Sequence, residues 1–328
     1  EFPHQVETLC LGFPELAHSP GDETALAGVV ARLYGTQHTE ASITAQAFDS
    51  VREGLLAAMD QPSIDGLNVF LVSAAARAQG WKVALSGLGA DELFAGYASF
   101  TQVPRLVRVM SALPGRTTIG EMSRNLLKAM AGGEGSPKLA GLFELEGSWS
   151  GAYLLKRGLF LPHELEARFG PSELRDGLEA LATDSALART IDGIGSSRLR
   201  MSALELSWYM RNQLLRDADW ASMAHSLELR VPFVDRELLR TVAGLAAAGF
   251  PMGKQDLAQA PHPPLPEAVR KRPKTGFQVP LWKWTGAAKP LSPGQVSRQW
   301  AERILAHALD ERPSGAKPPQ ESGMRAVA

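Results

Sequence analysis

The stretch VALSGLGADELFAGY, residues 83 to 97, joins an apolar run to a glycine-containing turn and then to a helical pattern. Residues 83–85 predict a β-strand and residues 92–97 a helix. Glycines after a strand let backbone N–H groups approach an anion. The carboxylates of Asp91 and Glu92 follow at once, and they would repel an anion unless a cation lies between. The stretch therefore predicts a metal-bridged phosphate site, or else a helix that Asp91 caps.

Two common phosphate-binding motifs do not describe this turn. The sequence contains no G-x-x-x-x-G-K-[ST] run. The dinucleotide-binding motif requires a third glycine where this chain has Glu92.

The segments before this stretch alternate between strand and helix patterns. Strands are predicted at residues 6–13 and 38–44, and helices at residues 22–35, 45–59 and 67–80. This order predicts an α/β fold, an open parallel sheet with flanking helices. Ligands bind such sheets beyond the carboxyl ends of the strands, where the turn at residues 86–92 lies.

The pattern becomes mostly helical after residue 100. Helices are predicted at residues 102–113, 118–132, 172–188, 197–219 and 235–248. We therefore divide the chain into an α/β part (1–100), a helical part (101–285) and a C-terminal helix with a tail (286–328). The tail from residue 311 is rich in Pro, Gly, Lys and Ser, and we expect it to be disordered.

Composition narrows the class of protein. The 328 residues carry a formal net charge of −1, which gives no electrostatic sign of nucleic-acid binding. The single cysteine, Cys10, excludes an intrachain disulfide framework and a cysteine-rich zinc site, and we expect it to be a buried structural thiol. No apolar run reaches the length of about 18 residues that a membrane helix needs, and no secretory signal is visible. We expect a cytoplasmic protein that binds neither nucleic acid nor membrane.

Two further stretches contain charged residues in apolar surroundings. Residues 214–235 read LLRDADWASMAHSLELRVPFVD, and we expect their charged side chains, Glu228 and Arg230 included, to form a structural ion-pair network. Residues 271–284 read KRPKTGFQVPLWKW. This loop is either a solvated basic segment or one that its aromatic residues hold in place. In the second case Lys274 would be fixed where it can stabilise charge in a transition state.

In this order, residues 84–97, 222–235 and 272–282 resemble motifs of the synthetase domain of glutamine-dependent asparagine synthetases. GTQHTE (35–40) and DQPSIDGLN (60–68) resemble weaker motifs of the same family, and the likeness extends from about residue 6 to about residue 285. The resemblance implies an ATP-binding fold of the adenine-nucleotide α-hydrolase type. It also implies a reaction in which ATP adenylates a carboxylate, pyrophosphate leaves, and ammonia from glutamine displaces AMP.

The same resemblance assigns roles to individual residues. Asp91 would bind Mg²⁺ at the pyrophosphate, with Glu92 as its support. Lys274 would stabilise charge during adenylation and amide formation. The remaining residues would contact ATP: the backbone of Leu11 at adenine, and Ser86 and Gly87 along the nucleotide.

One departure concerns the substrate. Asparagine synthetases usually have Glu at the position of Leu88, a position tied to acyl-adenylate formation, and a leucine side chain can neither accept a hydrogen bond nor carry a proton. The resemblance together with Leu88 leads us to expect aspartate or another small-molecule carboxylic acid as the substrate. An alternative is an enzyme that closes an amide within one molecule, as β-lactam synthetases and lasso-peptide cyclases do.

A second departure concerns completeness. The family's Ser-Gly-Gly-x-Asp-Ser loop and its glutaminase domain are not in this sequence. We expect an incomplete fragment, inactive alone, whose glutaminase domain lies upstream or acts in trans. A non-catalytic remnant that binds a partner is the alternative, and a homodimer is one assembly that the resemblance allows.

Overall fold

The computed structural model describes residues 5–112, 147–272, 279–285 and 292–310. Its N-terminal elements are β1 (Glu7–Gly12), α1 (Thr24–Tyr34), β2 (Gln37–Ser42), α2 (Ala45–Ala58), α3 (Gly66–Ala78), β3 (Val83–Leu85), α4 (Ala90–Leu93) and α5 (Ser99–Ser111). The middle of the chain forms α8 (Trp149–Arg157), α9 (Pro162–Phe169), α10 (Pro171–Leu181), α11 (Thr183–Thr190), α12 (Ser197–Leu204), a π-helix (Glu205–Leu214) and α13 (Leu215–Met223). The last elements are β4 (Glu228–Arg230), α14 (Arg236–Ala247), α15 (Lys254–Gln259), α16 (Glu267–Arg270), α17 (Leu281–Trp284) and α18 (Pro293–Asp310).

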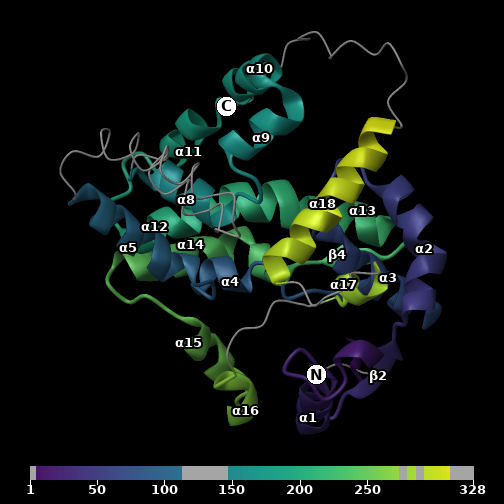
Figure 1. Cartoon of the computed structure of the whole chain (residues 1–328). Helices are drawn as coiled ribbons and strands as arrows, with labels where there is room; N and C mark the ends of the chain where they lie inside the picture. The colour runs from purple at the N-terminus through teal and green to yellow at the C-terminus, as the bar shows by residue number, and fades with distance from the viewer. Residues whose placement is uncertain (1–4, 113–146, 273–278, 286–291, 311–328) are drawn as a thin grey trace.

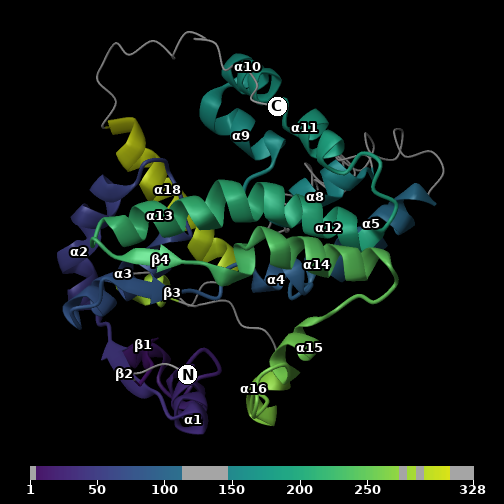
Figure 2. The ribbon, with the colours of Figure 1, turned by 180° about the vertical axis from the view of Figure 1, so that it is seen from behind.

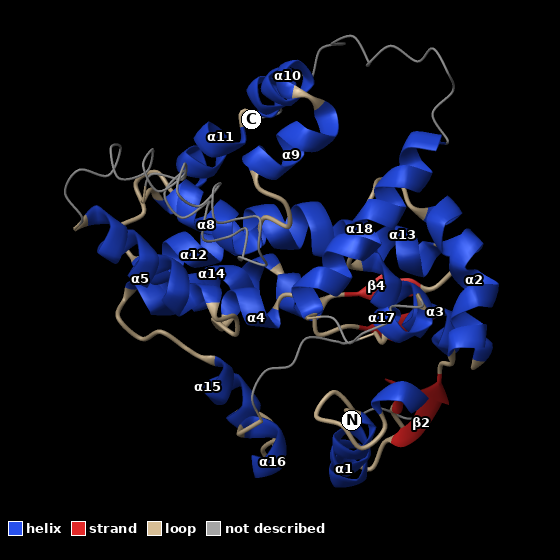
Figure 3. Ribbon diagram, viewed as in Figure 1, coloured by secondary structure: helices blue, strands red, loops and turns tan. Residues whose placement is uncertain are grey.

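The predicted α/β class with parallel strands is confirmed, but the sheet is small. β1 pairs in parallel with β2, from Glu7 opposite Gln37 to Gly12 opposite Ser42. β3 pairs in parallel with β4, from Val83 opposite Glu228 to Leu85 opposite Arg230. Within the described ranges these two pairs do not join into one sheet. In Figures 1 and 2, β1, β2 and α1 lie in a lobe apart from the main helical body, and Figure 3 shows how far helices outweigh strands.

Local signals explain where several elements begin and end. α1 ends at Gly35, whose φ of 63° is left-handed and favours glycine. Thr44 caps α2 by accepting a hydrogen bond from the backbone N–H of Ala47. The helix predicted at 172–188 divides into α10 and α11 at Ala182, which has a φ of 44°. The helix predicted at 118–132 and the tail from residue 311 lie outside the described residues.

The segment 214–235 differs from its predicted ion-pair network. It contributes α13 and the unpredicted strand β4, and Arg230 pairs with Glu228 on the surface. Arg216 does pair with Asp60, at 2.8 Å between Nε and Oδ2. The buried Asp217 instead accepts hydrogen bonds from Ser63 and Trp220, so neutral donors satisfy it.

The main core lies where α2, α3, α13, α17 and α18 meet. Phe48, Leu55, Leu67 and Phe70 are buried there beside Trp220. α3 approaches α13 so closely that a Cβ built on Gly66 would lie 2.1 Å from Cζ2 of Trp220. This position therefore requires glycine, and the contact fixes the start of α3 against α13.

We expect Gly66→Ala to lower the free energy of unfolding by about 1–3 kcal/mol, because the added methyl group overpacks the contact with Trp220. Gly54→Ala is the matched control. Gly54 lies inside α2 with no atom within 4 Å of a built Cβ, so alanine there should stabilise by up to about 1 kcal/mol. Urea unfolding followed by circular dichroism measures both, and equal effects would contradict the close contact.

Candidate functional site

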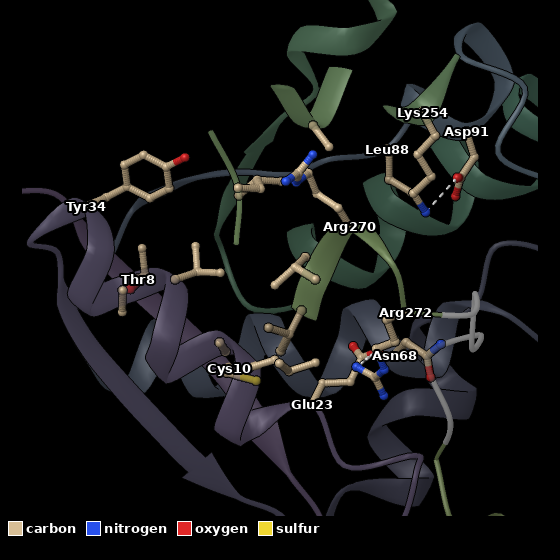
Figure 4. A pocket seen from close by; sticks show the side chains of 18 of the residues that line it. Thr8, Cys10, Glu23, Tyr34, Asn68, Leu88, Asp91, Lys254, Arg270 and Arg272 are labelled. Carbon is tan, nitrogen blue, oxygen red and sulfur yellow. Dashed lines mark hydrogen bonds and ion pairs between the residues drawn. The ribbon is translucent and has the colours of Figure 1, made fainter. Parts of the chain in front are cut away.

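A cavity of about 1300 Å³ separates the lobe of β1 and α1 from α3, α4, the π-helix and α15–α16. It exceeds the range of about 300–1,000 Å³ typical of small-molecule sites. Apolar side chains from β1, α1 and α3 form much of its wall, among them Cys10, Leu26, Val30, Val69 and Val72. Charged and polar side chains face the same space (Figure 4).

The turn after β3 places its residues at this cavity through contact with the segment that follows β4. The backbone N–H of Ser86 donates to the carbonyl of Arg230 at 2.8 Å, which extends the β3–β4 pairing. Gly89 has a φ of 99°, and a Cβ there would lie 2.9 Å from Cγ2 of Val234. Glycine is therefore required at this point of the turn on both grounds.

Asp91 projects from α4 to the cavity wall. Its Oδ1 lies 3.4 Å from Nζ of Lys254, the first residue of α15. A Cβ built on Gly96 would lie 1.8 Å from Oδ1 of Asp91. The space left by this glycine is thus what the Asp91 carboxylate occupies, so Gly96 positions Asp91.

Glu92 lies on the other side of α4. Its side chain is 1% exposed, and it accepts a hydrogen bond of 2.8 Å from the hydroxyl of Tyr97. Burial raises the pKa of Glu92, although the Tyr97 hydrogen bond lowers it in part. The adjacent carboxylates therefore differ in setting: Asp91 lines the cavity and Glu92 is buried behind it.

Three basic side chains reach the cavity from residues 254–272. They are Lys254, Arg270 and Arg272, and Figure 4 shows them around the space that Asp91 faces. Arg272 pairs with Glu23 at 3.1 Å, which links this segment to the α1 lobe. Nε of Arg270 is buried without a hydrogen-bond partner in the described ranges. This side of the cavity can therefore attract an anion.

The opposite polar wall centres on Asp65, Tyr97 and Tyr209. The Arg157 guanidinium lies 3.9 Å from the ring centre of Tyr209 and 4.6 Å from that of Tyr97. Arg157 also makes two hydrogen bonds, of 2.7 and 3.0 Å, to Oε2 of the fully buried Glu205. This ion pair fixes both tyrosine rings against the cavity.

The other predicted site residues have different settings. Leu88 lines the cavity, and Ser86 and Gly87 precede it in the turn. Leu11 is 5% exposed in β1, and its carbonyl accepts a hydrogen bond from the thiol of Cys10. Lys274 lies outside the described residues.

Residues 279–285, the described part of the predicted loop segment, are held in place by contacts of Lys283 and Trp284. Nε1 of Trp284 donates to Glu15 at 2.7 Å, and its ring stacks on Phe48. Nζ of Lys283 donates to the backbone carbonyl of Glu15 at 2.8 Å.

The described residues offer few ligands for a magnesium ion. Among the described residues no three His, Cys, Asp or Glu side chains lie close enough together to hold a metal ion. Asp91 offers a carboxylate at the anion-attracting space, where the other carboxylate, that of Glu23, is paired with Arg272. Mg²⁺ is commonly held by one or two carboxylates together with phosphate oxygens and water. Asp91 thus fits as one ligand of a Mg²⁺ ion that enters with a phosphate.

The comparisons with known proteins identify a family. The asparagine synthase family model matches residues 1–315. The chain belongs to the asparagine synthase family. A putative glutamine-hydrolysing asparagine synthetase of Mycobacterium tuberculosis H37Rv is 31% identical over 286 residues, 82% of this chain and 41% of the relative. Asparagine synthetase 1 of Bacillus subtilis is 27% identical over 299 residues, 87% of this chain and 44% of the relative. The chain spans less than half the length of these relatives.

Membership of the asparagine synthase family supports an ATP-dependent ligase at the level of the family. None of the described helices is both long and apolar enough to cross a membrane.

Sequence reasoning missed several cavity residues of this asparagine synthase family member. Asp65 belongs to DQPSIDGLN, but nothing local shows that it meets the π-helix. Lys254 lies in a polar segment that matches neither a phosphate-binding motif nor a family motif named above. The partner of Asp65 is Tyr209 and that of Lys254 is Asp91. Both partners are distant in the sequence, so these contacts form only when the chain folds.

We expect Cys10 to react slowly with iodoacetamide, because burial, followed by the negative charges of Glu23, Glu40 and Asp22, raises its pKa to about 11. Only the thiolate reacts, so at pH 8 roughly a thousandth of the thiol is reactive. Alkylation should be about a hundredfold slower than for free cysteine, and should accelerate up to pH 11. Cys10 is the only cysteine, so mass spectrometry follows it directly. Cys10 is half-buried at the cavity rather than fully buried as the sequence predicted. A rate equal to that of free cysteine at pH 8 would contradict this half-buried setting.

We expect Glu205→Gln to lower the free energy of unfolding by about 3 kcal/mol, because it leaves the charge of Arg157 without its buried partner. Glu237→Gln, which breaks an exposed pair with Arg240, is the control and should change stability by less than about 1 kcal/mol. Denaturant unfolding at pH 7 compares the two. A loss below 1 kcal/mol for Glu205→Gln would show that the pair does not hold this wall.

Proposed function

We propose that this chain provides the synthetase part of an ATP-dependent amide-forming ligase. ATP would adenylate a carboxylic acid with release of pyrophosphate, and ammonia would then displace AMP to form the amide. The chain's family and the position of Asp91 on the cavity wall support this proposal. Aspartate or another small acid would be the substrate, since Leu88 supplies no polar group to select it.

The arrangement of charges gives the chain's residues their roles. Lys254, Arg270 and Arg272 would bind phosphate oxygens and offset their charge. When bound, Mg²⁺ would neutralise charge on the departing pyrophosphate. Asp91 would hold that ion through its carboxylate, and Lys254 would exchange Asp91 for a phosphate oxygen. At about 4 Å and an effective dielectric of about 20, the attraction between one basic side chain and one phosphate charge amounts to about 4 kcal/mol.

The remaining roles rest on the family resemblance. Leu11, Ser86 and Gly87 would contact ATP, and Lys274 would stabilise charge in both chemical steps. Glu92 would support the turn from behind, through its hydrogen bond with Tyr97. Ammonia would come from a glutaminase domain, in the same longer protein or in trans, since the relatives are named as glutamine-hydrolysing enzymes.

One observation favours a second candidate, an enzyme that closes an amide within one molecule. Tyr97 lines the cavity and donates to Glu92, whose raised pKa makes it a stronger base than an exposed glutamate. Such a pair could accept the proton of an amine that attacks within the same substrate. Mass spectrometry of the product distinguishes the two: a gain of ammonia minus water for amidation, or a loss of water alone for ring closure.

The direct test is calorimetry of ATP with Mg²⁺ on the wild-type chain and on Asp91→Ala. We expect Asp91→Ala to bind at least about tenfold more weakly, because it removes a metal ligand. Asp49→Ala removes an exposed carboxylate on α2 that pairs with Arg52, and should leave binding unchanged. Equal binding by all three proteins, or no binding by any, would favour a non-catalytic remnant and contradict the proposal.

Gly96→Ala tests the same role without removing the carboxylate. The added methyl group would occupy the position of Oδ1 of Asp91, so we expect it to weaken binding of ATP with Mg²⁺ as much as Asp91→Ala does. Gly177→Ala, in α10 with open space around it, is the control. Unchanged binding by Gly96→Ala would show that the carboxylate need not stand where the structure has it.

A further inference from the structure

Asp65 is a cavity-lining carboxylate whose hydrogen bonds all go to one oxygen. Its Oδ2 accepts from the hydroxyl of Tyr209 at 3.1 Å and from Nε2 of Gln213 at 2.6 Å. Oδ1 accepts no hydrogen bond within the described ranges. It is also not one of the fully buried side-chain atoms without a hydrogen-bond partner, so solvent can reach it. Oδ1 is therefore the part of this carboxylate that a ligand in the cavity can reach.

The π-helix explains why two neutral donors meet at Asp65. Its residues Glu205, Tyr209 and Gln213 recur every fourth position, and the wide turn of a π-helix brings them near one face. Glu205 binds Arg157, and Arg157 covers the ring of Tyr209. The carboxylate of Asp65 is therefore held at a fixed place. Irregular π-helical turns of this kind are frequent at functional sites.

The charges around Asp65 do not balance within the described part of the chain. Arg157 already pairs with Glu205, and no lysine or arginine of the described ranges lies within ion-pair distance of Asp65. Burial raises the pKa of Asp65, while the Tyr209 hydrogen bond and the charge of Arg157 lower it in part. A half-buried carboxylate that faces a cavity with no cationic partner is a binding point for a cation.

We propose that Asp65, held by Tyr209 and Gln213, binds a primary ammonium group inside this cavity. A metal ion is a poorer fit, because the other donors at Asp65 are N–H and O–H groups that point at it. This inference deepens the proposed function. The ammonium group belongs either to the acid that is activated, which is then an amino acid, or to the amine that attacks it.

The experiment uses ligand pairs that differ in the ammonium group alone. L-aspartate is titrated against succinate, and L-glutamate against glutarate, into the full chain by calorimetry. Methylammonium chloride against potassium chloride, followed by saturation-transfer NMR, represents the attacking amine. If the acid carries the ammonium group, the wild type should bind the amino acid about tenfold more tightly than its deaminated partner. If the amine carries it, methylammonium alone should bind.

Asp65→Asn keeps the shape of the side chain and removes its charge, so the preference should fall to within about twofold. Tyr209→Phe, which removes one donor to Oδ2, should reduce the preference less. Asp49→Asn, an exposed aspartate on α2, is the control and should keep the full preference. Thermal melting shows that each variant is folded.

The proposal is overturned if no ammonium compound is preferred by the wild type, or if Asp65→Asn keeps the preference. Binding of ATP with Mg²⁺ is measured on the same samples. A failed nucleotide site with a retained ammonium preference would then count against the proposed function alone, and the reverse result against the ammonium site alone.

Discussion

The pairing of β3 with β4 is the constraint on which the candidate site depends. These strands are three residues each and lie far apart in the sequence, yet their register sets the turn that follows β3 against the segment that follows β4. Gly89 allows that approach to Val234, and Gly96 leaves room for the carboxylate of Asp91. Without the pairing, the two carboxylates of the turn would have no fixed direction.

Adjacent carboxylates acquire different properties from this geometry. Asp91 reaches the cavity and pairs with Lys254, whereas Glu92 is buried and bonded to Tyr97. Arg270 and Arg272 line the same cavity as the Asp91–Lys254 pair, and this cavity is large enough for a nucleotide and a second molecule. Two walls result, one that attracts anions and one, at Asp65, that attracts cations. An enzyme that transfers an acyl group from an adenylate to an amine, with AMP as the leaving group, would use both.

Much of the fold could be predicted from local signals. The strands at residues 7–12 and 37–42, and the helices between and after them, follow from apolar spacing, from Gly35 and from Thr44. The glycine turn with Asp91 was recognisable because its residue types are unusual in combination. The roles predicted for Leu11, Ser86, Gly87 and Lys274 stay predictions.

Other features could not be predicted because they depend on contacts between distant segments. β4 is short and stands in a charge-rich run, so its strand character comes from β3 rather than from its own residues. The π-helix interrupts a pattern that fits an ordinary helix, and Glu205 at its start is buried against Arg157, a residue distant in the sequence. The division between α10 and α11 falls at Ala182, and alanine is not a residue that predicts a turn. Asp65 and Lys254 can be recognised as candidate site residues only because the folded chain places both of them on the wall of the cavity.

The proposed function requires Asp91 to hold a metal–nucleotide complex at the carboxyl end of β3. A crystal structure of the chain with Mn²⁺ and a non-hydrolysable ATP analogue tests it most directly, because the anomalous signal of manganese locates the ion independently. We expect a manganese peak within coordination distance of the Asp91 carboxylate, with Lys254 turned to a phosphate oxygen. A nucleotide bound elsewhere, or a manganese ion away from Asp91 with the Asp91–Lys254 pair intact, would contradict it.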